Sequence, residues 1–226
     1  MPDIEFIPLH PWSLPPVKPH TDRTTARTER DLYQQHFRHL RITRLPADCP
    51  PWTLGQNLGW TVASPITLTM TPLNDIDVAV PDDEDLRTVS RRTGRSEMWK
   101  RGDDWIATSH SWPRMCDYRT PTGEWEGMFL PNGAGTLEWR LGFAARIPEP
   151  YFLTVLPLDP PLPGLDIPLG IIGAKTVNAM EATGGISIAI RPTHPLTLHR
   201  HQPIARLVLL HPDSLRATAT TRPGTT

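Results

Sequence analysis

Hydrophobic and polar positions alternate along most of this chain. The clearest alternating runs are WTVASPITLTMTP at 60–72, GTLEWRLGFAARI at 135–147 and YFLTVLPLD at 151–159. Because successive side chains of a strand point to opposite faces of its sheet, a period of two indicates half-buried β-strands. Shorter apolar or β-branched runs give the same signal at 4–12, 76–80, 169–177, 185–192 and 204–212.

Turn signals separate these runs. Gly102-Asp103 inside the segment 98–112 predicts a tight hairpin, and NGAGT at 132–136 predicts a second tight turn. A proline inside a helix removes a hydrogen bond and clashes with the preceding turn, so 27 prolines spread along the chain argue against long helices. The pattern therefore predicts an all-β fold, an antiparallel β-sandwich or distorted barrel.

The expected organisation is a single β domain over residues 1–212. Its one short helix is expected near 50–57, with proline in the first turn and a glycine after the end. Two polar stretches, 13–31 and 81–97, are interpreted as surface excursions from the sheet. Residues 213–226 offer little to bury and are expected to form a disordered tail.

Composition narrows the class of protein. Hydrophobic residues make up 38% of the chain and gather in runs, which argues against disorder throughout. The net charge of −1 provides no electrostatic footprint for nucleic acid or for an anionic membrane. No segment has the pattern of a signal peptide or a membrane span, so we expect a soluble, cytoplasmic protein. The preference for arginine over lysine suggests GC-rich coding, as in actinobacteria.

The two cysteines, Cys49 and Cys116, are too few for a disulfide scaffold. A single disulfide between them is the one pairing that the sequence allows. Cys116 lies between Arg114 and Arg119, which would lower the pKa of its thiol if they approached it. The alternative role for Cys116 is that of a small buried residue.

The segment TLHRHQPIARLVLLHP at 197–212 raises the question of a metal site. On a strand, His199 and His201 would share a face and could reach one metal ion, with His110 as a third ligand, as in cupin-type β-barrels. Such sites also need a nearby carboxylate, whereas residues 202–206 contain no acid and include an arginine. The alternative is that both histidines lie on the solvent face of a strand. We therefore expect no cofactor, with a divalent metal as the alternative.

Six of the eight tryptophans lie in the central part of the chain, interleaved with arginines. An indole face beside a guanidinium group can bind flat or anionic molecules. The alternative is a core built from large residues, with cation–π pairs. Alternation over 136–147 would place Leu137 and Trp139 on one face and Arg140 on the other. The candidate ligand-binding residues are Trp60, Trp99, Trp105, Trp139, Arg140 and Arg146.

Three blocks taken together resemble an uncharacterised bacterial family of unknown function. They are NLGWTVASPITL at 57–68, TLEWRLGFAARIPEPYFLTVLPL at 136–158, and the closing pair GISIAIRP and HQPIARLVLLHP. The resemblance spans most of residues 30–212 and implies an all-β domain without assigning an activity.

The last strand carries a second, local resemblance. Its run Ile204-Ala205-Arg206-Leu207 stands where the closing strand of the dUTPase-like β-clip fold has Ile-Ala-Gln-Leu. The aspartate and tyrosine of that family's nucleotide-binding loop are not found in the expected setting at 178–190. This likeness therefore implies β architecture and does not imply nucleotide hydrolysis.

The leading functional interpretation is a soluble bacterial β protein that binds a small aromatic or anionic molecule, with a role in specialised metabolism suggested by source composition and by the obscurity of the family that it resembles. Two alternatives stay open: a His-ligated, cupin-like metal-dependent enzyme, and a structural or assembly protein that pairs through a sheet edge. A homodimer is possible, and neither nucleic acid nor a membrane is expected as a partner. The sequence does not decide whether the protein is an enzyme.

Overall fold

The structure is a computed structural model that describes a large part of the chain. The described residues are 3–19, 24, 28, 31–32, 35, 50–82, 84–95, 97–108, 112–120 and 122–221. Two residues named in the sequence predictions, Cys49 and His110, lie outside these ranges.

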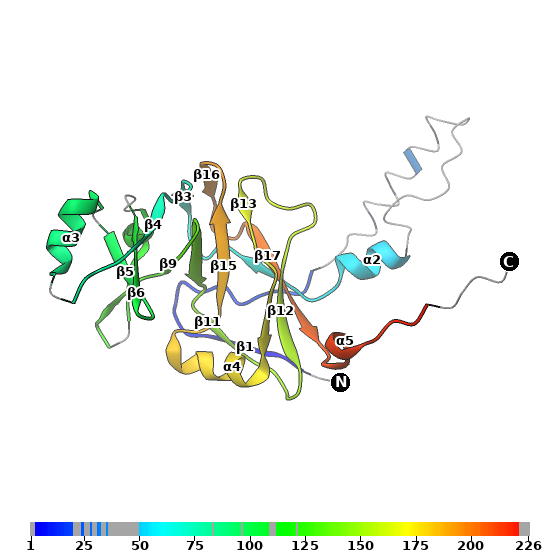
Figure 1. The fold of residues 1–226 in the computed structure, drawn as a ribbon. Helices are drawn as coiled ribbons and strands as arrows, with labels where there is room; N and C mark the ends of the chain where they lie inside the picture. Colours follow the sequence, from blue (N-terminus) through cyan, green and yellow to red (C-terminus); the bar gives the residue numbers. More distant parts are fainter. Residues whose placement is uncertain are drawn as a thin grey trace.

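Two four-stranded antiparallel sheets make up the larger part of the fold (Figure 1). The first has the order β13 (Leu165–Asp166), β15 (Ser187–Pro192), β10 (Thr136–Arg140) and β9 (Phe129–Gly133). The second has the order β14 (Gly170–Gly173), β12 (Phe152–Pro157), β17 (Pro203–Leu210) and β2 (Trp60–Ala63). The strand that carries the Ile204–Leu207 run thus lies inside its sheet, between β12 and β2.

One hydrophobic core draws on both of these sheets. Burial alternates along β10, so Leu137 and Trp139 are fully buried while Glu138 between them is not. Leu153 from β12 and Leu207 from β17 belong to the same cluster. The predicted alternation on this strand and the β-rich character of the chain are confirmed. None of the sheets in the described part of the chain closes into a barrel.

Three two-stranded pairings complete this part of the fold. They join β1 (Glu5–Pro8) to β11 (Phe143–Arg146), β16 (Leu196–Leu198) to β3 (Leu68–Met70), and β7 (Tyr118–Arg119) to β8 (Trp125–Glu126). The first pairing fixes the N-terminal segment against the middle of the chain. The second ends directly before the turn that contains His199. The registers of these small sheets therefore fix where the connections that follow β1, β7 and β16 lie.

A second, smaller cluster lies at one end of the molecule, on the left in Figure 1. It contains β4 (Asp75–Val78), β6 (Asp104–Thr108) and β5 (Glu97–Arg101), with the helix α3 (Leu86–Thr93). Its own core consists of Val78, Val89 and Ala107. Strands β5 and β6 pair Arg101 with Asp104, so the predicted hairpin turn at Gly102-Asp103 is confirmed.

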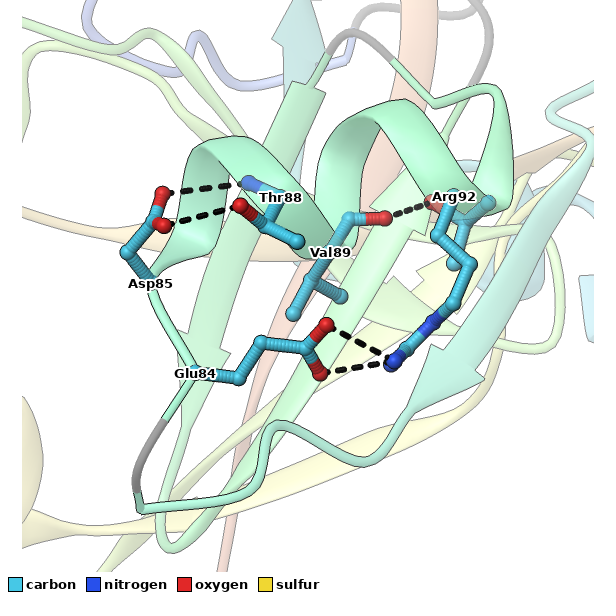
Figure 2. A network of polar contacts seen from close by, with 6 residues as sticks. Glu84, Asp85, Thr88, Val89 and Arg92 are labelled. Carbon is cyan, nitrogen blue, oxygen red and sulfur yellow. Dashed lines mark hydrogen bonds and ion pairs between the residues drawn. The ribbon is translucent and has the colours of Figure 1, made fainter.

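The helix α3 forms within the polar stretch 81–97. Asp85 caps the first turn of this helix by accepting hydrogen bonds from the backbone N–H groups of Arg87 and Thr88. The Thr88 hydroxyl also donates to Asp85, and this hydrogen bond lowers the pKa of the Asp85 carboxyl group. Arg92 donates two hydrogen bonds to Glu84, while Val89 is fully buried (Figure 2). Arg87, Arg91 and Arg92 thus lie on the exposed side of an amphipathic helix, and the acidic residues Glu84 and Asp85 directly precede its first turn.

The expectation of one short helix is wrong. The predicted helix is present as α2 (Pro50–Gln56), but α3, α4 (Ala174–Ala179) and α5 (Asp213–Arg216) are also helical. Helix α4 replaces the second half of the strand expected at 169–177, because Ala174 and Val177, three residues apart, share a buried helical face. No helix in the described ranges has the length and apolar character that crossing a membrane requires.

Thr154 on β12 supplies a test of the core. Its side chain is buried and its hydroxyl has no hydrogen-bond partner among the described residues. Since burying an unpaired hydroxyl is unfavourable, Thr154→Val should raise the free energy of unfolding by about 1 kcal/mol. Urea denaturation would measure this change.

Thr154→Ser is the matched control, because it keeps the hydroxyl and removes the methyl group. It should lower the free energy of unfolding by about 1 kcal/mol. A valine variant less stable than the wild type would show that the hydroxyl is stabilised by a partner.

Candidate functional site

The predicted histidine pair lies in a turn. Strand β16 ends at Leu198 and β17 begins at Pro203, so His199 and His201 belong to the connection. His201 has a left-handed backbone with φ of 72°, and its N–H donates to the carbonyl of Ser64 at 2.9 Å. The expectation that the two histidines share a strand face is therefore wrong. In the described ranges, no three His, Cys, Asp or Glu side chains are grouped so that they could hold a metal ion.

The predicted tryptophans lie in three separate places. Trp60 on β2 packs edge-on against Phe6 and lies under the Lys18 ammonium group at 4.4 Å. Trp99 and Trp105 are half-buried on the β5–β6 hairpin. Trp139 is fully buried against Phe129, with ring centroids 5.1 Å apart. The structure therefore does not gather them into one ligand platform, and Trp60 and Trp139 take the packing and cation–π roles.

The two predicted arginines are both neutralised by acids. The Arg140 guanidinium donates to Glu126 at 2.9 Å. Arg146 donates two hydrogen bonds of 2.9 Å to Glu181 and lies 3.5 Å from a carboxylate oxygen of Glu5. Neither group offers an uncompensated charge to a ligand.

A depression of about 720 Å³ lies elsewhere on the protein. It combines aromatic and basic side chains, the residue types that the sequence suggested for a ligand site. It is assembled from three distant parts of the chain: the segment after β1, the strand β7 with its following turn, and the turn between β16 and β17. Its lining residues are His10, Pro11, Trp12, Arg119, Thr120 and Arg200.

The first wall is a tight turn in the N-terminal segment. Leu9 donates its N–H to the carbonyl of Gly142, and Ser13 donates both its N–H and its hydroxyl to the carbonyl of His10. Gly142 has φ of 73°, and a Cβ at this position would overlap the ring of Trp12. Glycine at 142 thus lets the Trp12 ring lie directly against the backbone that follows β10.

The rings of His10 and Trp12 are stacked, with centroids 5.0 Å apart and planes within 4° of parallel. Tyr118 meets both rings edge-on, at 4.8 Å from His10 and 5.1 Å from Trp12. Its hydroxyl donates to Glu126 at 2.9 Å, and the same carboxylate oxygen accepts from Arg140. A buried tyrosine and an ion pair therefore support the stacked rings.

Two pKa shifts follow from this packing. Burial, together with the hydrogen bond to Glu126, raises the pKa of Tyr118, so its hydroxyl stays protonated and acts as the donor. Burial lowers the pKa of His10, and the charge of Glu126 opposes the shift only in part. The imidazole at the depression is therefore neutral at pH 7.

Two of the lining residues are arginines that are anchored to backbone carbonyls. Arg119 donates from Nε to the carbonyl of Gly123 at 3.0 Å. Arg200 donates from Nη1 to the carbonyl of Trp12 at 2.9 Å and to that of Pro65. Neither guanidinium has an acidic ion-pair partner among the described residues, whereas several others do: Arg92, Arg101, Arg140, Arg146 and Arg191. The depression consequently carries uncompensated positive charge.

Cys116, in the segment just before Tyr118, is a half-buried free thiol. Burial, with the nearby charge of Asp117 adding to it, raises the pKa of its thiol, which favours the protonated form at neutral pH. The interpretation of Cys116 as a small buried residue agrees with this setting better than that of an activated nucleophile.

Sequence reasoning missed His10, Trp12, Arg119 and Arg200 as one site. A weak signal was present, because His10 and Trp12 flank a proline and Arg200 lies between two histidines. Their proximity depends on strand register over more than a hundred residues, which no local pattern encodes. Tryptophan and arginine were the predicted residue types, but other members of these types form the depression.

No protein-family model, curated protein or solved structure matches this chain. The resemblances to an uncharacterised bacterial family and to the β-clip closing strand stay predictions.

The lowered pKa of His10 has a consequence for stability. Its pKa in the folded protein lies below the ordinary value of 6.5, so the unfolded chain binds the proton more tightly. The free energy of unfolding should therefore fall as pH drops from 7.5 to 5.5. His10→Gln should show a smaller fall, measured by urea denaturation at both pH values. Equal falls in the two proteins would contradict the shift.

Proposed function

We propose that this protein binds a small, flat, anionic molecule in the depression between His10, Trp12, Arg119 and Arg200. The observation that carries the proposal is the pair of guanidinium groups that backbone carbonyls hold in place and that no acid among the described residues neutralises. Arginines fixed in this way meet an anion without first losing side-chain entropy or breaking an ion pair.

The aromatic wall supports the flat part of the ligand. The stacked rings of His10 and Trp12 present apolar surface beside the two cationic groups, a combination that favours an aromatic ring bearing an acidic substituent. The volume of about 720 Å³ lies within the range of small-molecule sites, roughly 300–1,000 Å³. The proposal assigns binding and no reaction, and the role in bacterial specialised metabolism stays a prediction from composition and from the obscurity of the resembling family.

Benzoate is the simplest probe of this proposal, because it joins one ring to one carboxylate. Isothermal titration at low salt should detect its binding to the wild-type protein. Arg119→Gln should weaken that binding by about tenfold, roughly 1.4 kcal/mol, because one of the two fixed cations is lost. Added salt should weaken the wild-type affinity by screening the charges in this open site.

The matched control is Arg87→Gln on α3. Arg87 is also exposed and has no ion-pair partner among the described residues, but it does not line the depression. Benzoate affinity should be unchanged in this variant. Equal weakening in the two glutamine variants would mean that net charge, and not this site, governs binding.

A further inference from the structure

The two arginines of the depression use different parts of their guanidinium groups as anchors. Arg119 is held through Nε, so its terminal pair of nitrogens, Nη1 and Nη2, keeps its N–H groups. Arg200 is held through Nη1, so the Nε–Nη2 side keeps its N–H groups. Each arginine therefore retains one complete edge with two parallel donors, the edge that binds an anion in a bidentate manner.

Two such edges provide more donors than a single carboxylate uses well. A carboxylate is planar and has two oxygens, which one guanidinium edge already matches. A phosphate monoester has three terminal oxygens arranged tetrahedrally, so two of its oxygen pairs can accept from two separate guanidinium edges. Two free guanidinium edges lining one depression thus offer enough donors for a phosphate and more than a carboxylate can accept.

The charge of the depression also favours a phosphate over a carboxylate, independently of the hydrogen-bond donors. The two guanidinium groups contribute two positive charges to the depression, and the neighbouring imidazole of His10 is neutral at pH 7. A phosphate monoester carries about −1.5 to −2 at this pH, whereas a carboxylate carries a single charge. Only the phosphate neutralises both arginines.

We infer, as an extension of the proposed function, that the anionic group recognised in this depression is a phosphate monoester carried on a flat ring. Arg119 and Arg200 bind the phosphate through their free edges, and the ring lies beside His10 and Trp12. The ligand class is therefore a small aryl phosphate or a compound with the same two parts.

Isothermal titration at pH 8 with phenyl phosphate, benzoate and inorganic phosphate tests this inference. Phenyl phosphate is a dianion at this pH, since its second pKa is about 6. It should bind at least about tenfold more tightly than benzoate and than inorganic phosphate, because only it supplies both the ring and the tetrahedral dianion.

Arg119→Lys separates the guanidinium edge from its charge. The variant keeps one positive charge, so benzoate binding should change little, while the preference for phenyl phosphate should fall several-fold. Arg119 is exposed, so we expect the variant to fold, and circular dichroism would verify it. Arg87→Lys is the control and should keep the full preference.

The outcomes distinguish the inference from the proposed function. Benzoate binding as tightly as phenyl phosphate would overturn the phosphate assignment and leave the anion site intact. Inorganic phosphate binding as tightly as phenyl phosphate would overturn the assignment of a ring-bearing ligand. Binding of none of the three probes would contradict the proposed function itself.

Discussion

A hydrogen bond from the Arg200 guanidinium to the carbonyl of Trp12 joins positions 188 residues apart, and the candidate site depends on it. The N-terminal segment is held on one side by the pairing of β1 with β11 and by the bond from Leu9 to Gly142. Arg200 holds its other side and at the same time binds the carbonyl of Pro65. The Trp12 turn is thereby fixed between two sheets, and the same guanidinium that fixes it forms part of the depression.

The arginines at the candidate site fall into two groups with different roles. Arg140 belongs to the first group, because it balances Glu126 beneath the stacked rings and so allows Tyr118 to be buried with its hydroxyl satisfied. Arg119 and Arg200 belong to the second group, since carbonyl oxygens hold them without cancelling their charge. A carbonyl anchor orients a cation and leaves its long-range attraction for an anion largely intact. Arg95 and Arg206 are also held by backbone carbonyls, so what sets Arg119 and Arg200 apart is that both line one depression with His10 and Trp12.

Local sequence patterns predicted the elements whose period is short and regular. The alternation around Trp139 and the turn at Gly102-Asp103 depend on neighbouring residues alone, and both are confirmed. Helix α3 was not predicted, because its many charged residues hide the single buried Val89 that ties it to the smaller core. Helix α4 was not predicted, because a short apolar run fits a strand and a helix equally well.

The candidate site was beyond sequence reasoning for a different reason. His199 and His201 were expected on a strand, yet the backbone turns between them, and the residue that reaches the site is Arg200. Its relation to His10 and Trp12 is set by the register of β16 on β3 and of β1 on β11. A one-residue change of either register would displace the connections that carry these side chains relative to one another, so the site is a property of the assembled sheets.

The most direct test of this account is a crystal structure of the protein grown with saturating phenyl phosphate. The account predicts the phosphate oxygens about 2.7–2.9 Å from Nη1 and Nη2 of Arg119 and from Nε and Nη2 of Arg200, with the ring beside Trp12. Phenyl phosphate bound at another surface, while these two arginines keep only their carbonyl partners, would contradict it.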